Sequence, residues 1–571
     1  MNGPLTEAAE RLHAMKYRQP GEDFREAVNR VAFGLKDDDA HYKALRPILL
    51  GQRFLPGGRI QLSIGSQYAT TAYNCFVSGT FADSMVTGQG NIMQRQTEAV
   101  ATLRLGGGIG FDFSTLRPHG DPINELGTVT EGPLSFMHAF NAYSDCIAGA
   151  GMRRGAMMAV LRVDHPDIER FVRAKQNEHA LRRFNISVAV TDEFMEAVAG
   201  DKPFALKFGS QKRREVSAVE LWEKIMRSTH DWAEPGVIFI DRINEMNNLW
   251  YCEQIAACNP CSEQSLPPYG ACLLGSFNLV KYLRHVGSNH PEASAYEFDW
   301  DQFKADIPVI VRAMDNVVDR ARYPLPQQKA EAISKRRMGL GVAGLANAAE
   351  ALGCVYGGAV FLDFEAKVLS TLRDESYRAS AHLASEKGSF PLYDDEKYLG
   401  GRFTATLPDD VRDAIAKHGI RNSHLTSIAP TGTISLAADN ISGGIEPVFA
   451  YRIDRPIATP DGVMMETVED YGAKFLGVHG KLAPDVTADE HIDVLCTAQK
   501  YVDSAISKTI NMDEKKMDFD EFKSIYRKVF ERGGKGCATF NIGGKRGALL
   551  TNSDEGAACF VDPVTGRKEC A

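Results

Sequence analysis

Short apolar runs alternate with longer amphipathic segments along most of the chain. Three of the runs are apolar at nearly every position, as strands buried on both faces are, namely Met158 to Val163, Ile186 to Val190 and Val237 to Ile240. Other segments place apolar residues at helical spacing, namely 91–105, 165–176, 217–233 and 365–386. Strands that alternate with helices predict an α/β architecture with largely parallel strands.

The pattern changes near both ends of the chain. In residues 1–70, Phe24, Val28 and Val31 have helical spacing, and the stretch 54–59 then breaks regular structure with proline and glycine. No repeat of 20–50 residues and no low-complexity linker interrupts the chain after residue 70. We therefore predict an N-terminal helical region over 1–70, one large catalytic domain over 71–545 and a flexible C-terminal tail over 546–571.

Composition excludes several classes of protein. The 571 residues are 44% apolar and 24% charged, and no run approaches the roughly 18 apolar residues that a membrane span needs. The net charge of −9 disfavours binding to nucleic-acid polymers. Because the N-terminus lacks the features of a signal peptide, we expect a cytoplasmic protein whose eleven cysteines are reduced at rest.

The run from Cys258 to Val280 carries the most chemistry. Asn259, Cys261 and Glu263 alternate, so an extended loop or strand would point all three side chains the same way. An amide, a thiol and a carboxylate on one face can hold a hydroxyl-bearing substrate, exchange a hydrogen atom and act as a base. A further thiol at Cys272 points to redox chemistry.

Two other interpretations of these cysteines stay open at this point. Cys252, Cys258, Cys261 and Cys272 could surround a structural zinc, although Cys252 and Cys272 do not make the second tight pair that such sites use. Free cysteines also pack as small, unreactive apolar residues. The cysteines alone therefore do not decide between catalysis, zinc binding and packing.

Two glycine-rich stretches resemble a dinucleotide fingerprint but lack its context. The stretch 106–113 misses the final glycine. The stretch Gly339 to Gly344 fits G-x-G-x-x-G, yet it follows a charged, helix-like segment rather than an apolar strand. We therefore predict close backbone packing at these glycines.

Two further loops have the composition of anion-binding sites. The turn 430–435 offers three hydroxyls and backbone amides around a glycine, which suits a phosphate, although an ordinary helix-capping turn has the same composition. The stretch 149–157 carries two adjacent arginines, which suit a phosphate or a nucleobase edge, or form a solvated charge pair.

Taken in chain order, these motifs resemble the catalytic chains of ribonucleotide reductases over roughly residues 20–545, and most of all the adenosylcobalamin-dependent class II enzymes. The landmarks are Tyr73-Asn74-Cys75, Gly106 to Asp112, Arg153 to Ala156, Val163 to Asp167, Asn259 to Glu263, Cys272 to Ser276, Arg337 to Gly341, Pro430 to Thr433, Gly444 to Pro447 and Ser507 to Asn511. The resemblance implies a ten-stranded α/β barrel of two antiparallel five-stranded halves, with the catalytic cysteine on a central finger loop.

The resemblance also implies a role for each catalytic residue. Cys261 would be the thiyl radical that takes the 3′ hydrogen of the ribose. Glu263 would accept the proton of the 3′ hydroxyl, and Asn259 would hydrogen-bond the ribose hydroxyls. Cys75 and Cys272 would protonate the leaving 2′ hydroxyl, supply the reducing equivalents and end as a disulfide.

Substrate and effector sites follow from the same resemblance. The substrate, a ribonucleotide and in our reading a diphosphate, would contact Asn74, Arg153 and the phosphate turn formed by Pro430, Thr431, Gly432, Thr433, Ile434 and Ser435. A deoxynucleoside triphosphate effector would bind at Asp83, Ser84, Asp112 and Arg117, at the interface of a homodimer. Because the residues that usually precede the core lie near the start, we expect no ATP-cone and no shut-off by dATP.

The tail would carry the external reductant's electrons. Cys559 and Cys570 match the pair that re-reduces the active-site disulfide and is itself reduced by thioredoxin or glutaredoxin, although they are farther apart in the chain than the usual pair. We interpret Cys537 as structural.

The source of the radical follows from what the sequence lacks. A thiol S–H bond is strong, so Cys261 needs a cofactor to become a radical. The stretch 536–541 has no tyrosine pair to relay a radical from a partner subunit, and the glycines after it lack a glycyl-radical motif. Adenosylcobalamin is therefore the predicted cofactor, with no metal site. The alternatives are a class I large subunit with a separate radical subunit, and a nucleotide-sensing zinc protein.

Overall fold

The structure is a computed structural model that describes residues 3–123, 126–147, 155–177, 180–287, 295–459, 462–512 and 517–541. It also gives the backbone, without side chains, at 551–552, 559–561 and 568–570, and at 455–459 and 462–464 within the ranges above. No helix of the described residues is long and apolar enough to span a bilayer.

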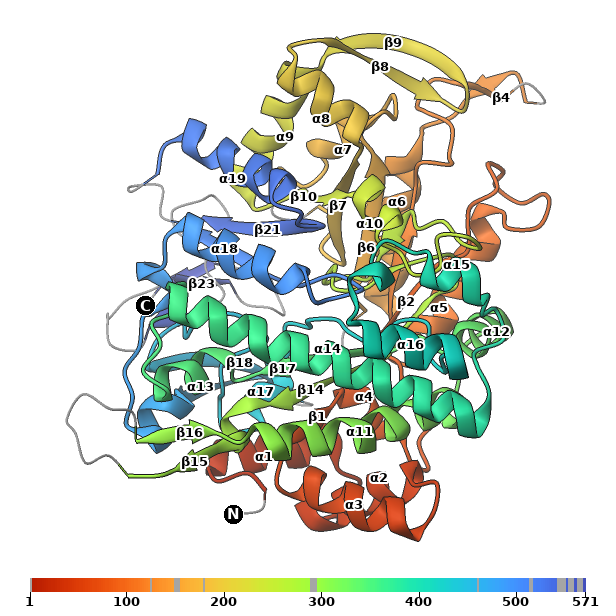
Figure 1. Ribbon diagram of the computed structural model, residues 1–571. Helices are drawn as coiled ribbons and strands as arrows, with labels where there is room; N and C mark the ends of the chain where they lie inside the picture. Colours follow the sequence, from red (N-terminus) through yellow and green to blue (C-terminus); the bar gives the residue numbers. More distant parts are fainter. Residues whose placement is uncertain are drawn as a thin grey trace.

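Three capped helices open the chain, within the region for which the sequence predicts helical structure. They are α1 (Glu7–Tyr17), α2 (Phe24–Leu35) and α3 (Asp39–Leu50). The side chains of Thr6, Asp23 and Asp38 each accept a hydrogen bond from a backbone N–H of the first turn, which satisfies a donor that the helix leaves unpaired. Strand β1 (Phe54–Pro56) and the short helix α4 (Gly58–Ser63) follow, and Figure 1 shows this region at one end of the molecule.

An eight-stranded sheet forms the first half of the interior. Five strands run parallel in sequence order, namely β2 (Cys75–Val77), β3 (Gly108–Asp112), β6 (Met157–Arg162), β7 (Phe184–Val190) and β10 (Gly236–Phe239). Strand β13 (Ala271–Cys272) pairs antiparallel with β2 at one edge. At the other edge, β21 (Gly536–Asn541) pairs antiparallel with β10 and parallel with β20 (Thr509–Met512). The three predicted apolar strands are β6, β7 and β10.

A second sheet lies beside the first and holds β1, β14 (Leu274–Asn278) and β17 (Gly339–Ala343). Isolated bridges pair Leu340 with Thr426 and Ile428 with Ile506. The described strands therefore form a mixed α/β fold but do not close into a hydrogen-bonded barrel, so the predicted ten-stranded barrel is not shown.

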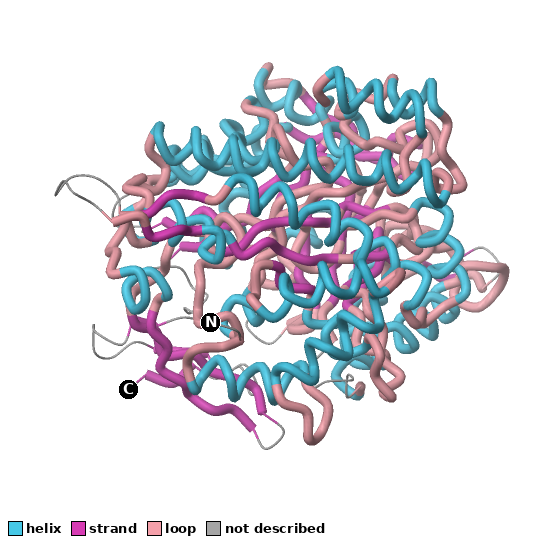
Figure 2. The backbone as a smooth tube through the Cα atoms, turned by 60° about the horizontal axis from the view of Figure 1, so that its bottom comes forward, coloured by secondary structure: helices cyan, strands magenta, loops and turns pink. Residues whose placement is uncertain are grey.

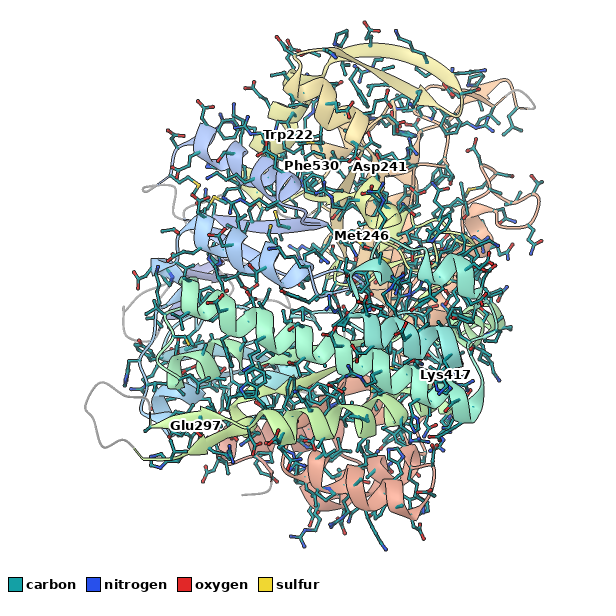
Figure 3. All side chains as sticks on the ribbon, in the orientation of Figure 1. Trp222, Asp241, Met246, Glu297, Lys417 and Phe530 are labelled. Carbon is teal, nitrogen blue, oxygen red and sulfur yellow. The ribbon has the colours of Figure 1, made fainter. Side chains whose placement is uncertain are left out.

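Helices surround the strands of these two sheets, which lie in the interior, whereas several short sheets lie at the periphery in Figure 2. Four of them match predicted segments, namely α5 (Ile92–Arg104), α7 (Ile168–Val172), α9 (Ala218–Trp232) and α14 (Ala359–Lys387). Trp222 of α9 contacts Tyr526 of α19 (Phe519–Glu531) with ring centres 6.4 Å apart. Phe530 of α19 lies 5.1 Å from Phe239 of β10 by the same measure, so aromatic packing holds this helix pair against the sheet (Figure 3).

The other helices of the described residues are α6 (Pro133–Cys146), α8 (Asp192–Ala199), α10 (Ile240–Glu245), α11 (Trp300–Arg320), α12 (Pro326–Lys335), α13 (Leu345–Ala351), α15 (Asp395–Leu399), α16 (Asp409–His418), α17 (Gly432–Leu436) and α18 (Ala488–Gln499). The other strands are β4 (Pro122–Ile123), β5 (Thr128–Val129), β8 (Pro203–Phe208), β9 (Gln211–Ser217), β11 (Ala257–Cys258), β12 (Ser265–Leu266), β15 (Leu283–His285), β16 (Tyr296–Phe298), β18 (Arg452–Thr459), β19 (Gly462–Glu469), β22 (Thr551–Asn552), β23 (Cys559–Val561) and β24 (Lys568–Cys570).

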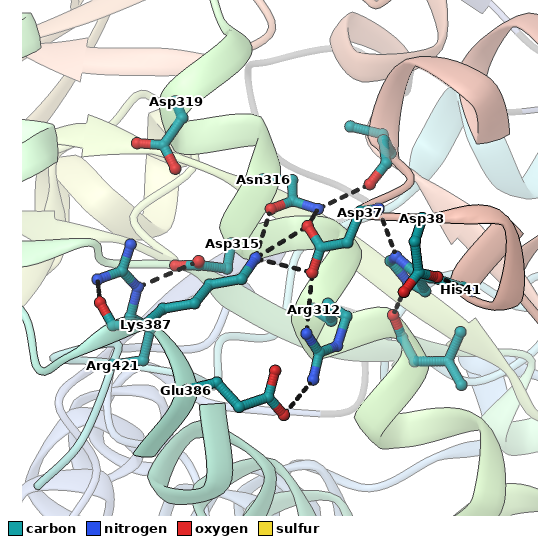
Figure 4. A network of polar contacts seen from close by, with 12 residues as sticks. Asp37, Asp38, His41, Arg312, Asp315, Asn316, Asp319, Glu386, Lys387 and Arg421 are labelled. Atoms are coloured by element: carbon teal, nitrogen blue, oxygen red, sulfur yellow. Dashed lines mark hydrogen bonds and ion pairs between the residues drawn. The ribbon is translucent and has the colours of Figure 1, made fainter. Parts of the chain in front are cut away.

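A polar network joins the N-terminal helices to the long helices α11 and α14 (Figure 4). Asp37, between α2 and α3, accepts hydrogen bonds from Arg312 at 2.9 Å, Asn316 at 2.7 Å and Lys387 at 2.9 Å. Arg312 also donates to Glu386. Burial alone would raise the pKa of Asp37, but these hydrogen bonds outweigh it and hold the pKa well below its ordinary value.

The glycine motif at 339–344 packs as the sequence predicts. It forms β17 itself, preceded by the helix α12 rather than by a strand. A Cβ atom at Gly341 would lie 2.4 Å from the carbonyl oxygen of Ser427, so only glycine fits there. Close backbone packing is confirmed at this position.

Candidate active site

The predicted catalytic loop is a tight turn at the tip of a hairpin. Strands β11 and β12 pair antiparallel, with Cys258 opposite Ser265, and residues 259–264 connect them. Asn259 accepts the backbone N–H of Gln264 on its side-chain oxygen at 3.0 Å, and its own N–H donates to the carbonyl of Gln264. Ser262 has a φ of 64°. The prediction that alternation in an extended segment aligns Asn259, Cys261 and Glu263 is therefore wrong, because a turn brings them to the tip.

The tip of this finger turn is fixed from several sides. Asn185 of β7 donates its side-chain amide to the carbonyl of Pro260 at 2.8 Å. The carbonyl of Glu263 accepts hydrogen bonds from the hydroxyl of Ser427 at 2.8 Å and the N–H of Ala505 at 3.0 Å. A Cβ atom at Gly110 of β3 would lie 1.9 Å from the carbonyl oxygen of Cys258. The finger turn therefore lies directly on the sheet, and a glycine is needed for that approach.

Burial separates the functional groups of the turn. Asn259 is 0% and Glu263 3% exposed, whereas Cys261 is half-buried. Among the neighbouring thiols, burial raises the pKa of Cys258 to about 12, so that thiol stays protonated. Of the thiols at the turn, Cys261 is thus the one that a ligand can reach.

Cys75 and Cys272 face each other across two strands. They are directly opposite in the antiparallel pair formed by β2 and β13, and both are buried and reduced. Opposite residues of an antiparallel pair have Cα atoms about 4.5–5.5 Å apart, which is within the range of a disulfide. The side-chain amide of Asn259 lies 3.9 Å from the sulfur of Cys272. The fold thus brings together residues that are far apart in the sequence.

A cavity of about 300 Å³ opens at the finger turn. Its lining includes Cys261 and Ser262 of the turn, Asn185 and Ser187 of β7, Pro430 and Cys537. A volume of this size is typical of a small-molecule site. Cys537 borders the cavity but is buried in the main apolar core, and its interpretation as a structural residue stays a prediction.

Two buried lysines also line this cavity. The ammonium group of Lys508 donates to Glu446 at 2.5 Å, to His491 at 2.8 Å and to the carbonyl of Thr509 at 2.7 Å. Burial lowers the pKa of Lys535 to about 8. No role was predicted for either lysine, although Lys508 lies in one of the motifs that carry the family resemblance.

The turn 430–435 lies between this cavity and the N-terminal region. Pro430 lines the cavity, Thr431 has a φ of 52°, and α17 begins at Gly432. The hydroxyls of Thr431 and Ser435 bond to each other at 2.9 Å, and Thr431 also accepts the N–H of Gly444. Thr433 is exposed and Ile434 packs against α1. Two of the three predicted phosphate-binding hydroxyls therefore already have partners within the protein.

Asn74 lies next to the cysteine pair. Its backbone N–H donates to the carbonyl of Cys272 at 3.1 Å. Its side-chain oxygen is buried and has no hydrogen-bond partner among the described residues, which suits a residue that receives a ligand. Arg153, the other predicted contact outside the turn, lies outside the described residues.

The predicted effector residues form one ion pair and two local contacts. Arg117 donates to Asp83 from its guanidinium at 2.6 Å and from its backbone N–H at 3.1 Å, and both side chains are about one-third exposed. The hydroxyl of Ser84 bonds to that of Thr87. Asp112 accepts the N–H of Ser114, and burial raises the pKa of Asp112. Asp83 and Arg117 thus lie together, as the predicted site requires.

The two tail cysteines are opposite each other in the backbone pairing. Strands β23 and β24 are antiparallel, with Cys559 paired with Cys570. Their separation along the chain is therefore no obstacle to pairing, because a hairpin removes it.

The described residues offer no alternative metal site. They contain no group of three or more histidine, cysteine, aspartate and glutamate side chains that could hold a metal ion. Cys252 is exposed whereas Cys258 and Cys272 are buried, so the four cysteines of the zinc interpretation have very different surroundings.

A buried pair of opposed thiols beside a turn whose own cysteine lines a cavity is typical of a thiol-dependent oxidoreductase. A model of the ribonucleotide reductase barrel domain matches residues 73–474 and 463–540. The chain belongs to the ribonucleotide reductase family.

Several curated proteins similar to the chain are named as vitamin B12-dependent reductases. The chain is 32% identical to the vitamin B12-dependent ribonucleoside-diphosphate reductase of Mycobacterium tuberculosis strain CDC 1551, over 89% of this chain and 72% of that protein. It is 32% identical to the protein of the same name from Thermoplasma acidophilum, over 78% of this chain and 59% of that protein. The vitamin B12-dependent ribonucleotide reductase of Streptomyces clavuligerus is 26% identical over 94% of this chain and 63% of its own length.

Proposed function

We propose that this protein reduces ribonucleoside diphosphates to 2′-deoxyribonucleoside diphosphates for DNA synthesis, with adenosylcobalamin as cofactor. The observation that carries the proposal is the register of β2 and β13, which sets Cys75 opposite Cys272 beside the finger turn of Cys261. The names of the similar proteins support the cofactor and the diphosphate substrate.

Each residue has a defined chemical task in this proposal. The sulfur of Cys261, as a thiyl radical, takes the 3′ hydrogen atom, and Glu263 takes the proton of the 3′ hydroxyl. Asn259 orients the ribose hydroxyls. Cys75 and Cys272 then give one proton to the leaving 2′ hydroxyl, which departs as water, and deliver two electrons and the remaining proton as they form a disulfide. At the end, Cys261 returns the hydrogen atom to the 3′ carbon and is itself a thiyl radical again.

The cavity at Cys261 fits a cofactor that acts on that thiol. When bound, adenosylcobalamin supplies an organic radical able to take the hydrogen atom of a thiol. The cavity has room for one nucleoside-sized group, and Cys261 forms part of its wall. None of its described lining residues is a tyrosine, which disfavours the class I alternative with its relay from a partner subunit. Ser187, Gly236 and Ala538 would contact the cofactor there.

We also propose that the two sheets belong to the ten-stranded barrel of this family. The bridges from Leu340 to Thr426 and from Ile428 to Ile506 continue β17 toward β20, and β13 runs directly into β14. One half of that barrel would be the parallel strands β2, β3, β6, β7 and β10. The other half would be β14, β17, the segment around Thr426, β20 and β21, and the halves would meet antiparallel at β10–β21 and at β2–β13.

Control by a deoxynucleoside triphosphate is a further part of the proposal. Asp83 and Arg117, held together by their ion pair, would bind the effector at the interface of a homodimer. Substrate preference among CDP, UDP, ADP and GDP should then change with the effector added. A substrate profile that stays the same with every effector would contradict this assignment.

The decisive experiment is anaerobic turnover of CDP and CTP by the purified chain, with and without adenosylcobalamin and with dithiothreitol as reductant. We expect CDP reduction only with the cofactor. Cys261→Ser should abolish product while leaving CDP binding nearly unchanged, whereas Cys252→Ser, at an exposed thiol nearby, should keep normal turnover. Turnover by Cys261→Ser, or activity that requires an added diiron or dimanganese protein, would refute the proposal.

A further inference from the structure

The N-terminal helix α1 lies against the far side of the phosphate turn. Leu12 and Tyr17 of α1 are buried in one cluster with Ala437, and Ile434 and Leu436 of α17 pack against it. The turn therefore borders the Cys261 cavity through Pro430 and contacts α1 through Ile434. Since α17 is only five residues long, its own hydrogen bonds do little to fix its position.

One carboxylate connects α1 to the residues that follow α17. The Oδ1 atom of Asp439 accepts three hydrogen bonds, from the backbone N–H of Leu5 at 2.8 Å, the N–H of Thr6 at 2.9 Å and the hydroxyl of Thr6 at 3.0 Å. Asp439 is 2% exposed. Charge-assisted hydrogen bonds from three donors to one buried oxygen form a strong and directional contact.

The same hydroxyl also caps the helix. Thr6 accepts the N–H of Ala9 on its side-chain oxygen, so it begins α1 and donates to Asp439 with one group. The backbone at Asp439 is left-handed, with a φ of 66°, and so is that of Asn440, with a φ of 57°. The segment after α17 thus has a backbone conformation that aspartate and asparagine tolerate better than most residues.

We propose that α1 is a positioning element for the substrate phosphate turn and that Asp439 is the residue through which it acts. This inference rests on the proposed role of residues 430–435 in binding the substrate phosphates. Asp439 is a positioning residue and touches no reacting atom. Loss of its bonds to Leu5 and Thr6 lets α17 shift relative to the finger turn, which weakens the binding of the diphosphate but not of the nucleoside.

The test compares two ligands on the full chain with adenosylcobalamin present, by equilibrium dialysis under anaerobic conditions. The affinity for CDP includes the contacts of the protein with the base, the ribose and the phosphates. The affinity for cytidine includes the contacts with the base and the ribose alone. Asp439→Asn should weaken CDP binding roughly 5- to 10-fold and leave cytidine binding within about twofold, because the amide keeps the left-handed backbone but loses the charge. In turnover the loss should appear in KM rather than kcat, since the phosphates do not react.

Thr6→Ala approaches the same contact from α1. It should weaken CDP binding roughly two- to fivefold. The double variant should bind CDP about as well as Asp439→Asn alone, because both changes disrupt the same contact between α1 and Asp439 and their effects therefore do not add. Asp23→Ala, which removes the corresponding cap of α2 without touching α17, is the matched control and should leave the ratio of CDP to cytidine affinity unchanged.

Gly432→Ala in the turn itself separates phosphate binding by the turn from positioning of the turn by α1. If Gly432→Ala lowers the ratio of CDP affinity to cytidine affinity while Asp439→Asn and Thr6→Ala do not, α1 has no positioning role and the inference is wrong. If neither the turn variant nor the α1 variants change the ratio, the turn does not bind the phosphates, and the assignment of residues 430–435 fails with it. Equal losses of CDP and cytidine affinity would also overturn the inference.

Discussion

Two pairs of cysteines occupy opposite positions in the backbone pairing of antiparallel strands: the inner pair, Cys75 and Cys272, and the outer pair, Cys559 and Cys570. Cys75 and Cys272 belong to the large sheet, are 2% and 0% exposed, and lie beside the finger turn. Cys559 and Cys570 belong to β23 and β24, which form a two-stranded sheet of their own in the described part of the chain.

The difference is the reason why we expect a protein reductant to need a second pair of thiols. Opposed positions on antiparallel strands give both pairs the spacing of a disulfide. Thiol–disulfide exchange requires one sulfur to attack another directly, so a protein reductant must reach the bond it reduces. The inner pair is buried and cannot meet a protein as large as thioredoxin. The outer pair, on a separate hairpin, is the candidate that carries electrons between the two.

The largest effect is expected when the inner pair is broken. Cys75→Ser and Cys272→Ser should each lower steady-state CDP reduction at least about 1000-fold with either thioredoxin or dithiothreitol, because the dithiol itself supplies the electrons. Cys354→Ser, at another buried and reduced thiol, should retain activity. Retention of a tenth of the activity by Cys272→Ser would remove the inner pair from the reaction.

Breaking the outer pair should have a conditional effect. With both Cys559 and Cys570 replaced by serine, turnover driven by thioredoxin should stop and turnover driven by dithiothreitol should continue, since a small dithiol can reach the inner pair. The control is Cys146→Ser, which removes an exposed thiol elsewhere. Equal rates with thioredoxin before and after the double replacement would show that the outer pair is not a shuttle.

The two pairs also show how far the sequence could lead. The predicted strands β6, β7 and β10 were found because buried parallel strands are continuously apolar, a local signal. That Cys75 lies opposite Cys272 depends on strand register, which is a tertiary property and was reached only through family resemblance. The alternation of Asn259, Cys261 and Glu263 was misleading, because Ser262 adopts a left-handed conformation that no pattern of polarity reveals.

Other parts of the site carried no local signal at all. Asp439 looks like any loop aspartate in the sequence, and its three donors come from the opposite end of the chain. Asn185 likewise donates a hydrogen bond to the finger turn from a strand that is distant in the sequence. Such contacts form only once the fold has formed, so a single sequence does not indicate them.

Two motif glycines allow the support of the finger turn beside the inner pair to be tested separately from substrate binding. Gly110→Ala would force a Cβ atom to within 1.9 Å of the carbonyl oxygen of Cys258, so the finger turn must move off the sheet. We expect at least about a tenfold loss of kcat, together with a lower melting temperature. At Gly432 a Cβ atom would meet nothing within 4 Å.

Gly432→Ala should therefore fold with an unchanged melting temperature and show its effect in KM for CDP. Circular dichroism and steady-state kinetics on both variants make the comparison. If Gly110→Ala keeps both its kcat and its melting temperature, the close contact between finger turn and β3 does not position Cys261.

The smallest effect on activity is expected from the network around Asp37 (Figure 4), whose described hydrogen bonds include no cysteine. The pKa of Asp37 is depressed in the folded state, chiefly by hydrogen bonds from Lys387 and Arg312 that outweigh burial. A depressed carboxyl pKa stabilises the fold above the unfolded value of about 4, and this contribution disappears as the pH falls through the folded pKa. Asp37→Asn should thus lower the free energy of unfolding at pH 7 by about 1–2 kcal/mol, allowing for screening at partly exposed partners.

Urea unfolding of the Asp37→Asn variant and the unaltered protein, at pH 7 and near pH 3, measures this contribution. The gap in unfolding free energy between the two proteins should narrow at the lower pH, with CDP reduction at 25 °C unchanged. The control is Asp39→Asn, at an exposed carboxylate paired with Lys36. It should change neither the free energy of unfolding nor the rate of CDP reduction. A gap that stays constant with pH would mean that Asp37 stabilises the protein by packing and not by its charge.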